Sequence, residues 1–391
     1  MLVSALLLFT PVFGEEEAYC AKCKNTGIVK SGIPPELVGL PFKSSVAIEH
    51  RSGCFGLGWL PCPAKDCPHA PEARKEFEKL TEPLKKWIAE RRASIDAKVL
   101  EKTPKLKGYL PFHAETAHFF LSGTFKSRKL KIEAMGKTKT ISLNPVESFH
   151  TYCTRAENAY SLYQELAKFP DEYKGNLAPK MLLYVSAEEQ EAKAVTLALC
   201  NFVDSTEGSM DAEKWVGYDD KDDLMLHHKM VSAVASLLTE DYGKIVLNED
   251  FPVWFKEAAC WWLEYRTFGE VRIFREGETE LAMDFPASKL EEAVWKEAGK
   301  AKGRMPSLRE AMDNNVNRLS GWHRIKNWSL IDWMVREYKQ DSFRRLLLDF
   351  KDNFGRERDP AGAFRRVFDK TPEEIEEAWL AWVKTAYKPK R

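Results

Sequence analysis

The chain has 391 residues, with 59 basic and 59 acidic side chains and a hydrophobic content of 44%. This length is enough for two or three domains with a buried core. The net charge is zero and both signs are mixed along the chain, so we expect no nucleic-acid partner. The 12 Trp and 22 Phe indicate a core or groove rich in aromatic side chains.

The first 14 residues, MLVSALLLFTPVFG, are almost wholly apolar and are followed by three glutamates. Val12 and Gly14 place small residues at the −3 and −1 positions of a cleavage site, as in secretory signal peptides. No later run approaches the ~20 apolar residues of a membrane helix. We therefore expect a signal peptide over residues 1–14, a secreted or periplasmic protein, and no further transmembrane segment. A buried N-terminal strand or helix is the alternative.

Five of the eight cysteines lie between residues 20 and 67. They are spaced as Cys20-x2-Cys23, then Cys54, then Cys62-x4-Cys67. The segment is also rich in the Gly and Pro residues that are typical of loops. This asymmetry predicts a separate Cys-rich module over residues 15–70.

Two fragments of this module, Cys23-Lys-Asn-Thr-Gly27 and Cys54-Phe-Gly-Leu-Gly58, resemble the CxxCxGxG repeats of DnaJ-type zinc-binding regions. The first repeat lacks one glycine, Arg51 stands where the second repeat would begin with Cys, and the last Cys pair has a four-residue spacer. The resemblance covers most of the module and implies a zinc-binding unit.

Two Cys pairs that a Gly-rich hairpin brings together can present four thiolates tetrahedrally to one zinc ion. Glycine permits the tight turns that direct backbone amides at sulfur. A disulfide framework, which secretion would allow, is the alternative, and with five cysteines it leaves one thiol over. A decayed module is a further alternative. The predicted ligands of a structural zinc are Cys20, Cys23, Cys62 and Cys67, with Cys54 or His69 as substitutes.

The next segments alternate between helix and strand patterns. Residues 72–100 form a charged amphipathic pattern, which predicts a linker helix within residues 71–105. Residues 118–123, 129–133 and 180–186 have the pattern of short strands. Asn144-Pro-Val-Glu147 predicts the start of a helix that runs to about Phe169, and Ser186 begins another. Residues 106–221 are therefore expected to form a mixed α/β layer.

Residues 222–391 have mostly helical patterns. Ser307-Leu-Arg-Glu310 and Thr371-Pro-Glu-Glu374 are capping boxes, and helices are expected near 327–339, 341–353, 360–368 and 372–386. The fold class predicted is α+β: a small mixed sheet, then a mainly helical C-terminal half, with a small Cys-rich module at the N-terminus.

Several segments between about residues 145 and 386 resemble, in order, the gluzincin (peptidase MA-like) metallopeptidases. Leu224–Leu238 stands where the HExxH helix belongs. Phe251-Pro-Val-Trp-Phe-Lys-Glu257-Ala-Ala resembles the segment that carries the third zinc ligand, and residues 364–379 resemble the terminal element. The resemblance implies a gluzincin-like domain, with an α/β part over 106–221 and a helical part over 222–391.

The residues that such a peptidase needs are mostly absent. Two histidines four residues apart on a helix bind the metal, and a glutamate after the first acts as general base. Counted from His227, these positions hold His228 and Val231; counted from His228, they hold Lys229 and Ser232. The third-ligand position keeps Glu257. The resemblance therefore implies a vestigial site of His227, His228 and Glu257, with no catalytic residue.

Simple packing is the alternative for this vestigial site. One of the two adjacent histidines would then be buried and the other would lie at the surface, because they are about 100° apart on a helix. Glu257 would pair with Arg266, Lys256 or a backbone donor.

Three functions fit the sequence. The first is a secreted, catalytically inactive gluzincin-like protein that acts as a binding or structural unit, with a polypeptide as its partner. The second is a zinc-dependent metallopeptidase with non-standard ligands, such as His323, His150 or Asp222. The third is a scaffold protein whose Cys-rich module binds the partner.

Overall fold

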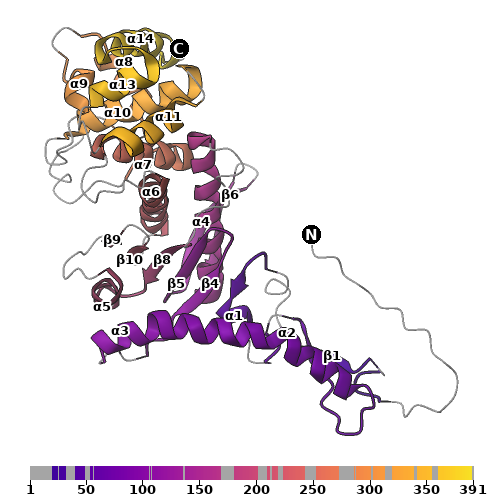
Figure 1. Ribbon diagram of the computed structural model, residues 1–391. Helices are drawn as coiled ribbons and strands as arrows, with labels where there is room; N and C mark the ends of the chain where they lie inside the picture. The colour runs from indigo at the N-terminus through magenta and orange to yellow at the C-terminus, as the bar shows by residue number, and fades with distance from the viewer. Residues whose placement is uncertain are drawn as a thin grey trace. The chain divides into compact units, whose positions relative to one another are not determined.

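The computed structural model divides the chain into two compact units, Met1–Arg91 and Arg92–Arg391 (Figure 1). The predicted signal peptide lies outside the described residues. No helix among the described residues is long and apolar enough to cross a membrane. The structure describes residues 20–24, 26–31, 40–48, 53–55, 57–104, 106, 108–134, 137–168, 180–200, 209–211, 214–218, 223–242, 252–272, 286, 288–300, 303–312, 319–338, 341–354 and 360–389.

The first unit contains a short antiparallel hairpin and a long helix. Strand β1 (Ile28–Lys30) pairs with β3 (Trp59–Pro61), and the chain then forms α2 (Ala70–Arg91). In the sequence, β2 (Lys43–Ser44) and α1 (Ser45–Ile48) come after β1 and before β3. The hairpin therefore brings together two segments that are about thirty residues apart in the sequence.

Aromatic and aliphatic side chains hold α2 within this unit. Phe77 of α2 makes edge contacts with Phe55 and Trp59, at ring-centroid distances of 6.3 and 5.4 Å. Farther along the helix, Trp87 and Ile88 are buried in a small hydrophobic cluster. Because Trp59 belongs to β3, the hairpin and the helix share one core.

The second unit is built on a mixed sheet. Its strands lie in the order β4 (Phe112–Glu115), β5 (Phe119–Gly123), β8 (Met181–Ser186), β10 (Lys214–Tyr218) and β9 (Ser209–Asp211). The pairs β5–β8 and β8–β10 are parallel, whereas β4–β5 and β10–β9 are antiparallel. The predicted mixed sheet is thus present.

Helices cover both faces of this sheet. Helix α4 (Pro145–Ala167) packs its aromatic rings against β4 and β5, as in the contact of Phe112 with Phe149. On the other face, Tyr184 and Val216 of the sheet form a core with η2 (Arg92–Asp96), α3 (Ala97–Lys102) and α5 (Glu189–Cys200). A separate hairpin contains β6 (Arg128–Ala134) and β7 (Lys137–Leu143).

The described part of the chain after residue 222 is mainly helical, as predicted, so the fold is α+β. Two helices, α6 (Asp223–Tyr242) and α7 (Val253–Phe268), pack against each other at its start. The elements that follow are α8 (Leu290–Glu297), α9 (Leu308–Ala311), α10 (Gly321–Trp333), η5 (Met334–Tyr338), α11 (Ser342–Asp349), η6 (Phe350–Phe354), α13 (Pro360–Phe368) and α14 (Pro372–Ala386).

The aromatic residues of α7 lie in the core of this helical region. Phe255 stacks on Phe343 at a centroid distance of 4.6 Å, and Trp254 makes an edge contact with Phe350 at 6.0 Å. The side chains of Trp254 and Phe255 are both fully buried. The aromatic rings therefore stabilise the helix packing through apolar burial, for which ~25 cal/mol per Å² is a typical value.

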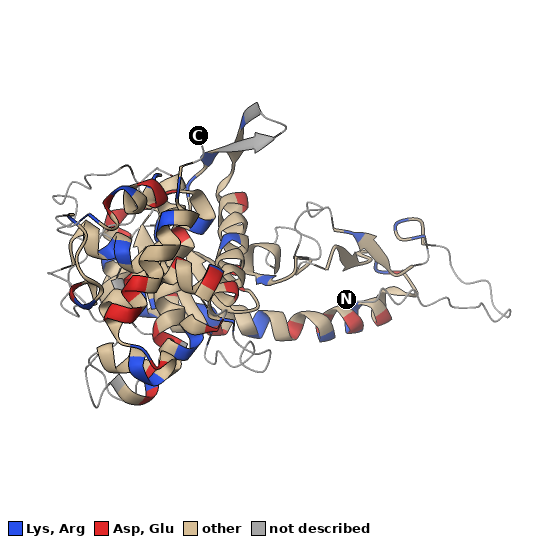
Figure 2. Ribbon diagram, turned by 90° about the horizontal axis from the view of Figure 1, so that it is seen from above, with Lys and Arg blue, Asp and Glu red and all other residues tan. Residues whose placement is uncertain are grey.

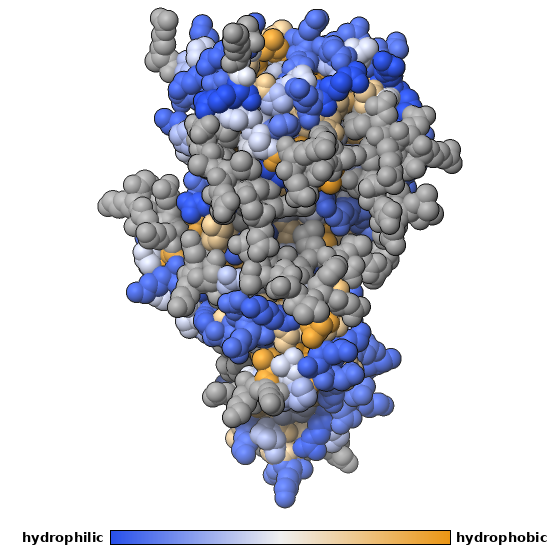
Figure 3. Space-filling model, turned by 90° about the vertical axis from the view of Figure 1, so that its left-hand side faces the viewer, coloured by the Kyte–Doolittle hydropathy of each residue, from blue (hydrophilic) through white to orange (hydrophobic). Residues whose placement is uncertain are grey.

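Charged residues show no single-sign region along the helices in the view of Figure 2, where basic and acidic residues alternate. On the face shown in Figure 3, hydrophobic residues form small separate areas between hydrophilic ones. The alternation in Figure 2 agrees with the balanced charge of the sequence, in which Lys and Arg equal Asp and Glu in number.

Candidate metal centre

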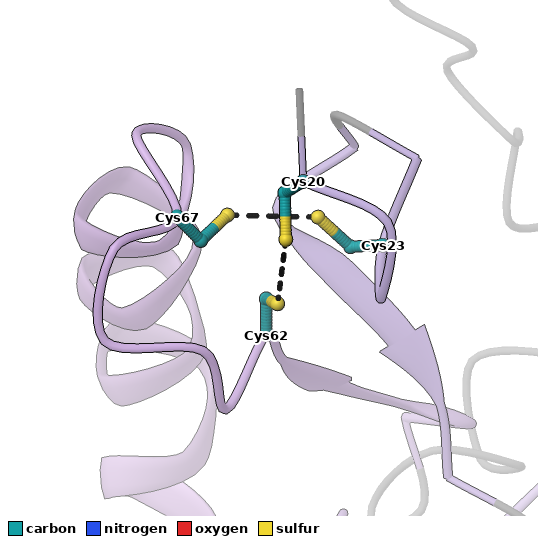
Figure 4. A group of neighbouring side chains, drawn as sticks. All are labelled: Cys20, Cys23, Cys62 and Cys67. Atoms are coloured by element: carbon teal, nitrogen blue, oxygen red, sulfur yellow. Dashed lines mark hydrogen bonds between the residues drawn. The ribbon is translucent and has the colours of Figure 1, made fainter. Parts of the chain in front are cut away.

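Four cysteine side chains converge at one end of the β1–β3 hairpin (Figure 4). Cys20 and Cys23 come just before β1, whereas Cys62 and Cys67 come between β3 and α2. All four are buried, and their sulfur atoms lie within 4.8 Å of one another. Among the described residues, this is the one group of three or more His, Cys, Asp or Glu side chains that could hold a metal ion.

The spacing of the sulfur atoms fits a tetrahedral thiolate site. Cys20 Sγ lies 3.7 Å from Cys62 Sγ, and Cys23 Sγ lies 3.5 Å from Cys67 Sγ. A tetrahedron with metal–sulfur bonds of about 2.3 Å has sulfur–sulfur edges of about 3.8 Å. The four thiols therefore surround a volume of the size that one such ion needs, and the predicted ligand set is the one that the fold brings together.

The local sequence explains why the two cysteine pairs meet. The Cys62 N–H donates to the carbonyl of Gly27 at 2.7 Å, which extends the β1–β3 pairing to the first residue of the second pair. Gly27 has φ +71°, and a Cβ atom there would lie 2.6 Å from the carbonyl oxygen of His69. Only glycine meets both requirements, because it adopts positive φ without strain and has no Cβ atom.

The turn around the first pair is fixed by hydrogen bonds. The Lys24 N–H donates to the Cys20 carbonyl at 2.8 Å. The Thr26 hydroxyl donates to the Cys23 carbonyl at 2.6 Å. These bonds hold Cys20 and Cys23 on one short turn, so that both thiols face the second pair.

Backbone amides point at the sulfur atoms, as the Gly-rich sequence led us to expect. The Cys23 N–H donates to Cys20 Sγ and lowers the pKa of the Cys20 thiol to about 7, although burial opposes this effect. The Ala64 N–H likewise donates to Cys62 Sγ, but burial and the neighbouring thiols raise the pKa of Cys62 to about 12. Burial raises the pKa of Cys67 as well. Without a cation, these thiols therefore cannot all ionise together.

The two predicted substitute ligands do not belong to this group of sulfur atoms. Cys54 is fully buried and its carbonyl accepts the N–H of Leu57 at 3.0 Å. His69 contributes through its main chain, because its N–H donates to Cys67 Sγ. The sequence did not suggest this backbone role, since any residue can supply an N–H.

The structure places His228 and Glu257, two residues of the predicted vestigial site, against other side chains of the protein. His228 is fully buried on α6, and its Nδ1 lies 2.5 Å from Oε1 of the fully buried Glu264 on α7. Its ring also stacks on Phe268 at a centroid distance of 3.7 Å. Glu257 accepts a hydrogen bond from Arg324 Nε at 2.6 Å, which is a different partner from those expected.

His227 precedes His228 on α6 and lies against aromatic rings. Its ring makes edge contacts with Phe268 at 4.7 Å and with Tyr152 at 6.4 Å. Burial lowers the pKa of His227 to about 3, and the positive charge of Arg155 adds to this effect. The imidazole is therefore neutral at ordinary pH. One adjacent histidine is thus fully buried and the other partly exposed, as the packing alternative requires.

A polar cluster at the start of α6 was not predicted from the sequence. Asp223 accepts two hydrogen bonds from Arg155, at 3.1 and 3.0 Å, and one from Arg128 at 3.3 Å. Burial acts to raise the pKa of Asp223, but the hydrogen bond and charge of Arg155 outweigh it, and the pKa is lowered. The carboxylate is thus ionised and balanced by arginine.

The alternative peptidase ligands do not assemble with His227 or His228 in the described residues. His323 lies at the start of α10, where its Nδ1 is 2.7 Å from the Ser320 hydroxyl. Burial lowers the pKa of His150, on α4, to about 4. Asp222 lies outside the described residues.

Comparisons with protein-family models, with curated proteins and with solved structures found no match to this chain.

Proposed function

We propose that this protein is a catalytically inactive, gluzincin-like binding protein whose N-terminal module is held by a structural zinc ion. In this proposal it is secreted or periplasmic and its partner is a polypeptide. The observation that carries the proposal is the convergence of four buried cysteine sulfur atoms.

Zinc is the metal proposed because four thiolates in tetrahedral arrangement are typical of structural zinc sites. Cys20, Cys23, Cys62 and Cys67 would fill all four coordination positions, which leaves no place for a reacting water. Such an ion can stabilise a small fold by ~10 kcal/mol. The centre would therefore stabilise the fold of the hairpin and the start of α2, and would not catalyse a reaction.

The lack of hydrolytic activity is supported by the bonding of the helical region. Glu264 and Arg324 already engage His228 and Glu257, so neither side chain points at a shared position. At the position of a peptidase's general base the sequence has His228, counted from His227, or Lys229, counted from His228. Loss of such a base typically lowers the rate ~10²–10⁴-fold.

Metal analysis of the full chain tests this proposal. We expect about one zinc ion per chain in the wild type, none in Cys62→Ser, and an unchanged content in the matched control His227→Ala. We also expect no peptide hydrolysis that a chelator can stop. Zinc that is lost in His227→Ala, together with chelator-sensitive hydrolysis, would favour the metallopeptidase with non-standard ligands.

A further inference from the structure

Two short sulfur–sulfur distances in the four-cysteine centre join cysteines that are far apart in the sequence. Cys20 lies 3.7 Å from Cys62, and Cys23 lies 3.5 Å from Cys67, so each short distance crosses the hairpin (Figure 4). A disulfide bond is about 2.05 Å long, so each pair must close by about 1.5 Å. The β1–β3 pairing holds the two backbones in place for both pairs.

We propose that this centre is also a site of thiol oxidation, at which a small disulfide oxidant joins Cys20 to Cys62 and Cys23 to Cys67 and releases the metal. The inference rests on the zinc centre of the proposed function and adds a second state to it. In this state, two covalent cross-links replace the ion, and the ends of the hairpin stay joined.

The exchange is balanced with a low-molecular-weight disulfide as oxidant. The Cys20 thiolate attacks one sulfur of the oxidant, which gives a mixed disulfide and one small thiolate. The Cys62 thiolate then attacks Cys20 Sγ, which forms the protein disulfide and releases the second small thiolate. Two electrons pass from the protein to the oxidant. The same exchange joins Cys23 to Cys67 with a second oxidant molecule, and the zinc leaves as Zn²⁺ because its ligands are consumed.

Cys20 is the thiol at which the exchange would begin. Its relative exposure is 9%, against 5% for Cys23, 4% for Cys67 and 0% for Cys62. An attacking thiol must reach the oxidant, so the most exposed of the four cysteine residues reacts first and the fully buried one, Cys62, serves as the resolving thiol.

The same arrangement connects the two alternatives that the cysteine spacing left open. Under reducing conditions the four thiols suit a metal, and under oxidising conditions they suit two disulfides. Both states tie the segment before β1 to the segment that leads into α2. The module would therefore keep its hairpin in either environment.

Disulfide mapping of the zinc-loaded full chain tests this inference. The chain is incubated with oxidised glutathione and a zinc indicator dye, then alkylated and digested with trypsin. Cleavage after Lys22 and Lys65 separates the four cysteines onto different peptides. We expect release of about one zinc per chain, with cross-linked peptides that join Cys20 to Cys62 and Cys23 to Cys67. Pairs within each sequence motif, or four unreacted thiols with zinc retained, would overturn the inference.

Cys54→Ala is the matched control. Cys54 shares a tryptic peptide with Cys62 but is not one of the four converging thiols, so the variant must give the same two cross-links. The outcomes also separate the two proposals. A chain that binds no zinc but forms both cross-links would refute the metal centre alone. A chain that binds zinc but forms other pairs would refute the oxidation site alone.

Discussion

The four-cysteine centre and the α6–α7 region use residues with metal-binding side chains in opposite ways. In the first, four sulfur atoms face one point and lie within 4.8 Å of one another. In the second, His228 faces Glu264 and Glu257 faces Arg324, so the donor atoms are turned to separate partners. The comparison teaches that residue type and spacing suggest a metal site, whereas convergence of the donor atoms determines whether the residues could hold an ion.

The four-cysteine centre and the α6–α7 region also differ in how the charges of their side chains are balanced. Deprotonation of the clustered thiols would place like charges together, which a cation can balance. Burial already disfavours the thiolates and acts to raise the pKa values of Cys62 and Cys67. In the α6–α7 region, each carboxylate has a basic partner from the protein itself. The first region could therefore accept a cation, whereas Glu264 and Glu257 of the second region already lie against basic side chains.

The largest effect is expected for His228→Ala. This change leaves the buried carboxylate of Glu264 without its imidazole, which typically costs about 3–5 kcal/mol. Thermal or urea unfolding of the full chain measures the loss. His227→Ala is the control and should cost less, because His227 is partly exposed and contacts aromatic rings. Equal or increased stability of His228→Ala would indicate a strained functional ligand instead.

A smaller effect is expected for Gly27→Ala. The new Cβ atom would lie 2.6 Å from the His69 carbonyl oxygen, at φ +71°, so we expect a loss of about 2–4 kcal/mol in zinc binding, or about 30- to 1,000-fold in affinity. Gly53→Ala is a matched control, because Gly53 has φ +68° and nothing lies within 4 Å of its Cβ position. Equal losses in the two variants would show that the close approach does not matter.

The zinc affinity should fall as the pH falls. Cys62 and Cys67 have raised pKa values, so both are protonated near pH 7 when no metal is bound. Zinc must displace at least these two protons, and its apparent affinity should therefore decrease about 100-fold for each pH unit below 7. Competition with a chelator of known pH dependence measures the slope. Each displaced proton contributes a factor of ten per pH unit, so a slope of about tenfold per unit or less would mean that zinc displaces fewer than two protons.

The smallest effect is expected for His69→Ala. Four sulfur atoms already complete the tetrahedron, and the His69 main-chain N–H that donates to Cys67 Sγ remains in the variant. Zinc content and affinity should stay within about threefold of the wild type. An affinity loss of more than about tenfold would make the imidazole a ligand and would weaken the contrast between the two regions.

Local signals in the sequence predicted much of the fold. The capping boxes at Asn144 and Thr371 mark the starts of α4 and α14, because the bonds that define them join residues three positions apart. The cysteine spacing identified the four thiols that converge, since Gly27 and the short hairpin act within the same segment.

Partners that are distant in sequence could not be predicted. Glu264 is 36 residues from His228, and Arg324 is 67 residues from Glu257. Their pairing depends on how α6, α7 and α10 pack, which no local pattern specifies. Glutamates at positions 257 and 264, within an aromatic helix, were the available signal that a buried charge needs a partner.

Gly27 approaches His69 closely, so the sequence pattern of this centre includes a glycine as well as the four cysteines. In sequence form it is Cys-x2-Cys-x3-Gly, then a first strand, then a second strand followed at once by Cys-x4-Cys. A chain with four such cysteines but a side chain at the glycine position could not bring its two halves equally close. The glycine can therefore distinguish true members of this class of centre from chance pairs of cysteines when other genomes are searched.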